Sequence, residues 1–442
     1  MKKPLLLLLF AASYLHAAEP NILVILTDDQ GYHDTGYYGT EDIRTPAMDS
    51  LAASGMRFDN FYANSCVCSP TRASLLTGCY PDRVGVPGVI RTQEEDSWGY
   101  LDPQAVLLPQ MLKQAGYHTA IIGKWHLGLE SPNTPNERGF DFFHGFLADM
   151  MDDYWTHLRC NNNYMRRNQE VVDPKGHATD IFTAWAIDYI KERKSQSSPW
   201  FLYLAYNAPH FPIQPPEEWL EKVKTREPQL SEERAKLVAF IEHLDFGIGQ
   251  VIDALKQTGQ YENTLIIFSS DNGGLLSVGA NNGPIRGGKG SMYEGGLRVP
   301  TVMVWPDKVR PGSSTEQNVL TMDIFPTLCE IASVPIKHKI DARSFLPILL
   351  QTKDVLPARD EYFVRREGGS YFVGDTIKAL RCGDWKIVKN RIDEPYELYN
   401  LSADPLEERN RATSNEAEYE DMKLRIRTQI QQAGAIPWQK RD

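Results

Sequence analysis

The stretch NILVILTDD, residues 21–29, decides how the chain is interpreted, because an apolar run ends in two adjacent carboxylates. The run from Asn21 to Thr27 is rich in Ile, Leu and Val, which predicts a β-strand. Asp28 and Asp29 follow directly, where the strand leaves the sheet. In open α/β sheets, ligands bind outside the carboxyl ends of the strands. The stretch therefore predicts both a strand and one side of a site.

Apolar strands alternate with amphipathic helices through the rest of the first 350 or so residues, which predicts a sheet covered by helices. Thr45-Pro46 is expected to open a helix, with Pro46 at its first position. A second helix is expected to begin near Thr71 and to end at Gly78. Further strands are predicted at 117–122, 199–206 and 264–269, and further helices at 107–115, 179–194 and 231–258.

The pattern changes beyond about Arg359, where EYFVRREG (361–368), residues 371–389 and YELYNL (396–401) predict strands of a small antiparallel sheet. A helix is expected from about Asn415. We therefore expect a large domain over residues 19–355 and a C-terminal subdomain over residues 356–442.

The first 18 residues have the pattern of a secretory signal peptide. Lys2 and Lys3 precede an apolar run from Leu5 to Ala12, and small residues follow at the expected cleavage site after Ala18. The run is too short to span a bilayer, and no long apolar stretch follows it. The sequence predicts a soluble protein that is exported, to the periplasm or beyond.

The net charge is −11, and loss of two lysines with the signal peptide makes it −13. This acidity disfavours nucleic-acid binding, which needs a basic face. An anion could be bound only in a locally basic pocket. The cysteines do not have the spacing of a zinc site, and they occupy positions 66, 68, 79, 160, 329 and 382.

Charged or metal-binding residues follow four of the predicted strands, which makes one converging site the simplest interpretation. Asp28, Asp29, Asp271 and Asn272 offer oxygen atoms, which suit a hard cation such as Ca²⁺ or Mg²⁺. A turn or a helix cap would explain any one of these pairs alone, but not all of them together.

Cationic and proton-carrying side chains accompany these oxygens, and a site of this kind suits a phosphate or sulfate ester. An arginine can hold an oxyanion through two donors, whereas a lysine offers a point charge. Lys289 lies in the glycine-rich segment GGKGSMYEGG, where the backbone can approach a ligand closely. The set comprises Arg72, Lys124, His126, His210 and Lys289.

The stretch CVCSPTR, residues 66–72, indicates which of the two esters, sulfate or phosphate, is the substrate. Cys68, Pro70 and Arg72 fit the C-x-P-x-R core of the type I sulfatases, in which the cysteine is oxidised to formylglycine (3-oxoalanine). Cys66 does not fit, because Pro70 and Arg72 fall at the wrong offsets from it; a small buried residue is expected there. Further blocks resemble sulfatase motifs in the family's order: DDQGYHD, GKWHLG, APH, SSDNGG, GGKGSMYEGGLRVP and ELYNLSADPLEERN.

This resemblance implies an alkaline-phosphatase-like α/β fold, a maturation enzyme that generates formylglycine, and one divalent metal, usually Ca²⁺ rather than Mg²⁺. Arg72 and Lys124 would hold the modified residue, His126 would act on its hydroxyls, and His210 and Lys289 would face the sulfate and the leaving group. The metal ligands would be Asp28, Asp29, Asp271, Asn272 and the modified Cys68.

The aldehyde explains why a cysteine is converted. Its hydrate carries two hydroxyls on one carbon, so one can attack sulfur with metal assistance while His210 protonates the leaving oxygen. The second hydroxyl, deprotonated by His126, can then collapse to the aldehyde and expel sulfate by C–O cleavage, which a plain serine could not do.

The segment RGFDFFHGFLADMMDDYW, residues 138–155, departs from the family because no serine in it aligns with the sulfate-contacting position of some members. His144 and Asp149 are possible replacements. Residues 149–177 have little periodicity, and they could be a surface loop or a wall of the substrate site. The candidate substrate-binding residues there are Tyr154, Trp155, His157 and Arg159.

A sulfated saccharide is the expected substrate, with a terminal sulfate removed from a short or partly digested glycan. An N-acetylhexosamine sulfate from a glycosaminoglycan or mucin would fit. Two alternatives stay open. The same scaffold could hydrolyse phosphate or phosphonate esters, although Cys68 counts against this, or the protein could bind sulfated glycans without turnover.

Overall fold

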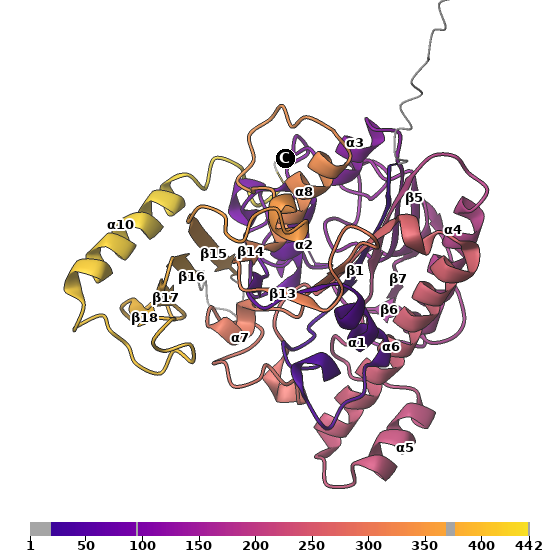
Figure 1. Ribbon diagram of the computed structural model, residues 1–442, viewed down its shortest axis with the longest axis horizontal. Helices are drawn as coiled ribbons and strands as arrows, with labels where there is room; N and C mark the ends of the chain where they lie inside the picture. The colour runs from indigo at the N-terminus through magenta and orange to yellow at the C-terminus, as the bar shows by residue number, and fades with distance from the viewer. Residues whose placement is uncertain (1–18, 94–95, 368–375, 441–442) are drawn as a thin grey trace, which may run out of the picture.

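The structure is a computed structural model that describes residues 19–93, 96–367 and 376–440. The expected signal peptide, residues 1–18, lies outside the described residues, as does the start of the strand region expected from residue 371. A ten-stranded sheet with helices on both faces forms the body, and a four-stranded sheet lies beside it (Figure 1).

Five adjacent parallel strands form the centre of the large sheet. They are, in spatial order, β11 (Thr264–Ser270), β1 (Asn21–Thr27), β10 (Trp200–Ala205), β4 (His118–Lys124) and β5 (Phe142–Phe146). Beyond β11 lie β12 (Val302–Val304), β2 (Met56–Phe58) and β13 (Ser313–Thr315), and beyond β5 lie β8 (Met165–Arg167) and β9 (Glu170–Val171). The predicted helix-covered α/β sheet is confirmed, with antiparallel strands joining at both sides.

Alternate residues of β1 enter different cores, because successive side chains of a strand point to opposite faces. Ile22, Val24 and Leu26 pack into the core covered by α2 (Cys68–Thr77), α3 (Leu108–Lys113) and α8 (Ile324–Ile331). Leu23 and Ile25 pack into the core covered by α1 (Pro46–Ser54), α4 (Ala178–Arg193) and α6 (Glu232–Thr258). The central strands are therefore buried on both faces.

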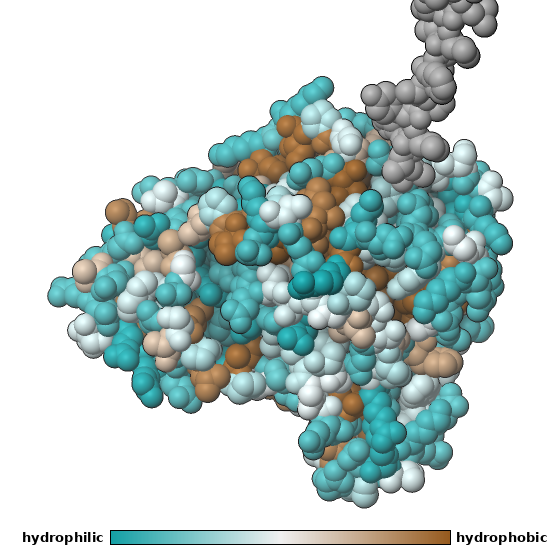
Figure 2. All heavy atoms as spheres, viewed as in Figure 1, coloured by the Kyte–Doolittle hydropathy of each residue, from teal (hydrophilic) through white to brown (hydrophobic). Residues whose placement is uncertain are grey.

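Short elements complete the body. They are β3 (Phe61–Tyr62), β14 (Val319–Leu320), β6 (Leu158–Arg159), β7 (Asn162–Asn163), α5 (Glu217–Arg226), α7 (Glu294–Leu297) and α9 (Leu346–Leu349). Strands β8 and β9 fall within residues 149–177, so part of this segment forms one edge of the main sheet. No described helix has the length and apolar character needed to cross a bilayer, and the face shown in Figure 2 is largely hydrophilic.

Helix α2 begins at Cys68, three residues before the predicted start near Thr71. Pro70 is compatible with this earlier start because it occupies the third helical position, where a backbone N–H would have no partner within the helix. The helix ends as predicted at Gly78, whose φ of 68° is left-handed. The earlier start places Cys68 at the first position of the helix, directly at the sheet edge.

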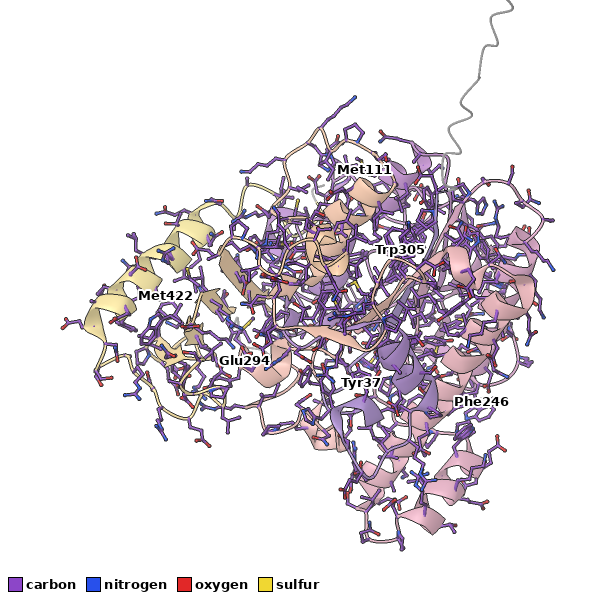
Figure 3. The ribbon with its side chains drawn as sticks, in the orientation of Figure 1. Tyr37, Met111, Phe246, Glu294, Trp305 and Met422 are labelled. Atoms are coloured by element: carbon purple, nitrogen blue, oxygen red, sulfur yellow. The ribbon has the colours of Figure 1, made fainter. Side chains whose placement is uncertain are left out.

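The C-terminal sheet is antiparallel, as predicted, with the order β15 (Asp360–Arg366), β16 (Thr376–Cys382), β17 (Trp385–Lys389) and β18 (Glu397–Asn400). Helix α10 (Glu416–Gln431) covers it and buries Met422 and Ile426 in a third core. Figure 3 shows Met422 on this helix, at one end of the molecule.

Candidate active site

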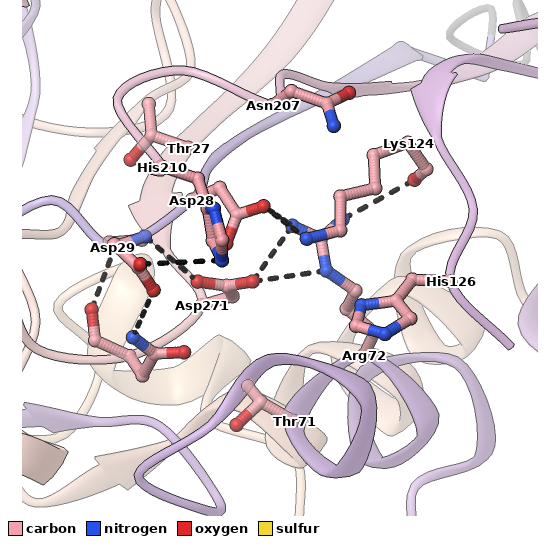
Figure 4. Close-up of polar contacts among 12 residues, drawn as sticks. Thr27, Asp28, Asp29, Thr71, Arg72, Lys124, His126, Asn207, His210 and Asp271 are labelled. Carbon is pink, nitrogen blue, oxygen red and sulfur yellow. Dashed lines mark hydrogen bonds and ion pairs between the residues drawn. The ribbon is translucent and has the colours of Figure 1, made fainter. Parts of the chain in front are cut away.

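The carboxyl ends of four adjacent strands bring together the polar residues that the sequence places after them (Figure 4). Asp28 and Asp29 follow β1, Lys124 ends β4, Asp271 follows β11, and His210 follows β10 after a short loop. Arg72 reaches the same point from α2. The expected convergence is therefore present.

Three carboxylates form the acidic half of the site. Oxygen atoms of Asp28, Asp29 and Asp271 lie within 4.8 Å of one another, and all three residues are buried. The Asn272 Nδ2 amide donates to Asp29 Oδ1 at 2.8 Å. Asp28 Oδ1 and Asn272 Oδ1 are buried without a hydrogen-bond partner in the described part of the chain. Unused, clustered oxygens of this kind fit a hard divalent cation.

Three cations balance the three carboxylates. Arg72 donates from Nε and Nη2 to Asp271 Oδ2 at 3.0 and 2.7 Å. Lys124 pairs with Asp28, and Lys289 Nζ lies 2.6 Å from Asp29 Oδ2. We call these residues the sheet-edge cluster: Asp28, Asp29, Asp271, Arg72, Lys124 and Lys289.

The charged state of the cluster follows from these pairs. Burial opposes ionisation of Asp28, but the neighbouring Lys124, His210 and Arg72 outweigh it and hold the pKa of Asp28 well below its usual value. The cluster therefore holds ionised groups out of water, an arrangement that is costly to build and typical of functional sites.

His126 is held as a neutral base. Its Nε2 lies 2.8 Å from the carbonyl oxygen of Ile90, so this nitrogen donates and Nδ1 carries the lone pair. Nδ1 is buried without a partner in the described structure. Burial and then the charges of Lys124 and Arg72 lower the pKa of His126 well below its usual value. His126 also has a left-handed φ of 60°, and such strain is found preferentially at functional sites.

His210 and Lys289 form a proton-sharing pair. His210 Nδ1 donates to the Phe211 carbonyl oxygen at 2.5 Å, so Nε2 accepts from Lys289 Nζ at 3.0 Å. Burial and then the Lys289 ammonium lower the pKa of His210. The Lys289 side chain is 17% exposed and that of His210 is 11% exposed, whereas Asp28, Arg72 and Lys124 are sealed. The site therefore opens to solvent on the side of this pair.

The two cysteines of CVCSPTR have different surroundings. Cys68 lies with Asp28 and His210, with ligand atoms within 4.8 Å of one another, and burial raises the pKa of its thiol to about 12. Cys66 is fully buried in the third core, as expected for a packing residue. All six cysteines lie in the described ranges, and each is a free thiol.

Two glycine-rich segments meet backbone to backbone beside the cluster. A Cβ atom on Gly273 would lie 1.8 Å from the carbonyl oxygen of Gly295. Glycine therefore allows SSDNGG to approach GGKGSMYEGG closely. This contact places Asn272 and Lys289 on the same side of the cluster.

The candidate substrate residues of the 138–177 region are dispersed. Tyr154 is buried and donates its hydroxyl to the carbonyl oxygens of Asn207 (2.7 Å) and His210 (3.0 Å), so it braces the His210 loop. His157 is also buried, with Nε2 bonded to Gly176. Neither ring presents a free face to solvent, and a role for the two residues in substrate binding stays a prediction.

The other four candidates differ in exposure, and Asp149 among them is buried. Arg159 is paired with Asp149 at 2.9 and 3.0 Å, and Trp155 is 49% exposed. His144, in β5, stacks on Trp185 of α4 and makes no recorded contact with the sheet-edge cluster. Only Trp155 offers a large open aromatic face among them.

Asn207 was missed by the sequence analysis. It is the second residue after the end of β10, and its buried Oδ1 has no partner in the described structure (Figure 4). Its position after a strand was the available signal. The Ile90 carbonyl, which fixes the His126 tautomer, is a backbone group and left no signal in residue types.

Comparison with known proteins identifies the family. The sequence profile described as "Sulfatase" matches residues 20–334, and "N-sulphoglucosamine sulphohydrolase, C-terminal" matches residues 288–435. The chain is 33% identical over 394 residues to arylsulfatase J of Mus musculus, covering 84% of this chain and 64% of that protein. It is 34% identical over 391 residues to N-acetylgalactosamine-6-sulfatase of Homo sapiens, covering 83% and 71%.

A solved structure agrees in architecture. "Ps i-CgsB in complex with k-i-k-neocarrahexaose" superposes with a TM-score of 0.87 at 31% identity, over 96% of this chain and 95% of that one. The fold, the ordered motifs and these matches agree, and the chain belongs to the sulfatase family.

Proposed function

We propose that the protein removes sulfate from a sulfated saccharide with formylglycine, made from Cys68, as its nucleophile. The observation that carries this proposal is the position of Cys68: it opens α2 at the point where the sheet-edge cluster, His126 and His210 meet. An unmodified thiol with a raised pKa in this pocket would be a poor nucleophile, which favours a converted residue.

A divalent cation is part of the proposal, Ca²⁺ rather than Mg²⁺. Asp28, Asp29, Asp271, Asn272 and the modified residue 68 would hold it, and the two unpartnered oxygens support this assignment. When bound, such an ion stabilises negative charge on the oxygens that it touches. The lysines, arginine and carboxylates of the cluster cancel one another, so the added ion would leave a net positive pocket for an anionic ester.

The surrounding residues take complementary roles in the proposal. Arg72 and Lys124 would fix the modified side chain and the carboxylates beside it. His126, neutral and with an unused lone pair on Nδ1, would take a proton from a hydroxyl on residue 68. The leaving oxygen would receive its proton from the His210–Lys289 pair, which lies on the open side of the site.

The substrate class is supported by the relatives. One relative is named for N-acetylgalactosamine-6-sulfate and one solved neighbour holds a carrageenan hexasaccharide. We propose a saccharide with a terminal sulfate on a short or partly digested glycan, with an N-acetylhexosamine sulfate as the first candidate. Trp155, the exposed aromatic residue of the neighbouring loop, could stack on a sugar face.

Export and processing complete the proposal. The leader would be removed after residue 18, a maturation enzyme would convert Cys68, and the mature enzyme would act in the periplasm or outside the cell. Residues 19–355 would form the catalytic domain and residues 356–442 the C-terminal subdomain.

The test is sulfate release from a panel of mono- and disaccharides, each sulfated at one known position, with protein from cells that perform the maturation. We expect release from one or a few compounds, and the position cleaved names the substrate. The mass of the peptide from Phe58 to Arg72 reports whether residue 68 is converted. Converted protein that releases no sulfate from the whole panel would contradict the saccharide assignment.

Hydrolysis rates on a matched aryl sulfate and aryl phosphate distinguish a sulfatase from the alternative, a phosphate or phosphonate ester hydrolase. We expect the sulfate to be hydrolysed faster, because the proposed nucleophile resolves by C–O cleavage and not by attack of water on sulfur. Faster hydrolysis of the phosphate would favour that alternative. Glycan binding without turnover by converted, metal-loaded protein would favour a binding protein.

A further inference from the structure

A second group of metal-binding side chains lies where α4 packs against α6. His177 and Asp180 belong to the start of α4, and His243 belongs to α6. Each offers a ligand atom within 4.8 Å of the other two. The group shares no residue with the sheet-edge cluster.

Both ring nitrogens of His177 make hydrogen bonds, and one of them carries a lone pair. Nε2 donates to the carbonyl oxygen of Gln214 at 3.0 Å, whereas Nδ1 accepts from the Thr179 backbone N–H at 3.2 Å. Nδ1 therefore carries the lone pair, and a metal ion bound there would replace the Thr179 N–H as its partner. A histidine that binds metal through one nitrogen typically donates the other N–H to a carbonyl or carboxylate. His177 caps α4 and Asp180 is its third residue, so Nδ1 faces the turn that carries the carboxylate.

His243 and Asp180 already share a proton. His243 Nε2 lies 2.7 Å from Asp180 Oδ1. The His243 side chain is 4% exposed and that of Asp180 is 59% exposed, so two buried imidazoles meet a carboxylate that reaches solvent. An ion could enter on the Asp180 side.

The spacing is close to that of a tetrahedral zinc site. With bonds of about 2.0–2.1 Å, ligand atoms around zinc lie about 3.3 Å apart. His243 Nε2 and Asp180 Oδ1, now 2.7 Å apart, must therefore separate slightly. The ligand nitrogen of His177, which lies within 4.8 Å of both, must move closer, and side-chain rotation can provide both changes.

Three aromatic rings pack against the imidazole of His177 and fix its position. Its ring stacks on Tyr154 with centroids 5.3 Å apart and an interplanar angle of 17°. Trp155 and Phe240 pack edge to face against it at 5.2 and 5.6 Å. A ligand fixed before the metal arrives loses little freedom on binding.

We propose that His177, Asp180 and His243 bind a first-row transition-metal ion, preferably Zn²⁺, with water in the remaining position. Imidazole nitrogens favour Zn²⁺, whereas Ca²⁺ favours an all-oxygen shell such as that at the sheet edge. On binding, the ion takes the position of the proton between His243 Nε2 and Asp180, and that proton moves to His243 Nδ1, so the imidazole stays neutral. The site does not depend on the proposed reaction.

Calorimetric titration of the mature, Ca²⁺-saturated protein with Zn²⁺ tests the proposal. We expect one Zn²⁺ per chain. His243→Ala should abolish this binding, and Asp180→Asn, which alters an exposed side chain and leaves the fold intact, should weaken it roughly tenfold or more. Circular dichroism checks that each variant is folded.

Two matched variants serve as controls. His338→Ala removes a histidine outside the group, and Cys160→Ser removes an exposed thiol, which is another soft ligand for zinc. Both should bind Zn²⁺ as the parent does. Zinc binding that survives both His243→Ala and Asp180→Asn, that disappears in Cys160→Ser, or that is absent from the parent would overturn the assignment.

Discussion

A comparison of two buried ionic clusters among the described residues shows that they differ in which polar atoms are left without a partner. The sheet-edge cluster lies at the carboxyl ends of the parallel strands. The second, which we call the bridging cluster, joins α7 to the C-terminal sheet, and Figure 3 shows Glu294 between these parts. It consists of Glu294, Lys386, Glu407 and Tyr62.

The bridging cluster is closed. Lys386 Nζ lies 2.8 Å from Glu294 Oε1 and 2.9 Å from Glu407 Oε1. The Tyr62 hydroxyl donates to Glu294 Oε2 at 2.7 Å. None of the three charged side chains is more than 3% exposed. Burial opposes ionisation of Glu294, but Lys386 outweighs it and lowers the pKa of Glu294.

The sheet-edge cluster, in contrast, keeps an unused oxygen on Asp28, lies next to a second unused oxygen on Asn272, and opens to solvent beside Lys289. Both clusters bear the desolvation cost of buried charge. In one, every charge is directed at another part of the chain, so it stabilises the fold. In the other, the unpaired atoms are available to a ligand, so we expect changes there to affect activity first.

Of the changes considered, removal of the bound metal should cause the largest loss of activity. Exhaustive chelation should abolish sulfate release, and Ca²⁺ should restore it, because the unpaired oxygens lie in or next to the sheet-edge cluster. Saturating Ca²⁺ at a hundred times its dissociation constant should also add about 2.7 kcal/mol to the unfolding free energy. Full activity after chelation, with metal absent by elemental analysis, would contradict the account.

Lys289→Ala should lower kcat by roughly 10²- to 10⁴-fold, the usual contribution of a positioned proton donor. The loss should be much smaller on an aryl sulfate whose leaving group is acidic and needs no proton. The two substrates are compared in steady-state kinetics, with the thermal midpoint of the variant as the control for folding. An equal loss on both substrates would remove Lys289 from the proton-donating role.

Lys386→Met, unlike Lys289→Ala, should reduce the stability of the fold and leave the activity nearly unchanged. It leaves Glu294 and Glu407 buried without their cation, which should cost about 3–5 kcal/mol of unfolding free energy. Denaturant titration measures this loss. Activity per folded molecule should stay close to that of the parent, because the bridging cluster faces no ligand. A selective loss of kcat in a stable Lys386→Met protein would erase the distinction between the clusters.

Tyr154→Phe should have the smallest effect, about 1 kcal/mol of stability and a few-fold decrease in kcat, because it removes the hydroxyl that braces the His210 loop. Tyr206→Phe is the matched control: its buried hydroxyl bonds to the Thr183 side chain of α4, at 2.8 Å, and not to a backbone carbonyl of the His210 loop. Stability should fall similarly in both variants, and kcat only in the first. An equal kcat in the two would show that Tyr154 is purely structural.

Sequence predicted the central strands well, because uninterrupted apolar runs such as 21–27 can be satisfied only inside a covered sheet. It also predicted the sheet-edge cluster, because residues that follow parallel strands must meet at one edge. The start of α2 was placed three residues late, since the tolerance of a first turn for Pro70 depends on geometry that residue type does not report.

The surface loop was less predictable. Tyr154 was assigned to the substrate because an aromatic residue in a polar segment suits a sugar, yet tertiary packing turned its ring inward. The meeting of His177 and Asp180 with His243 depends on how α4 packs against α6, and their separation in the chain gave no indication of it.

The most direct test of the central claim compares Cys68→Ala with Cys66→Ala. Both remove one buried thiol from the same short stretch, but only Cys68 lies in the site. Sulfate release from the best saccharide of the panel should disappear in Cys68→Ala and persist in Cys66→Ala, with both proteins folded. Substantial sulfate release by Cys68→Ala would contradict the account, whatever the result for Cys66→Ala.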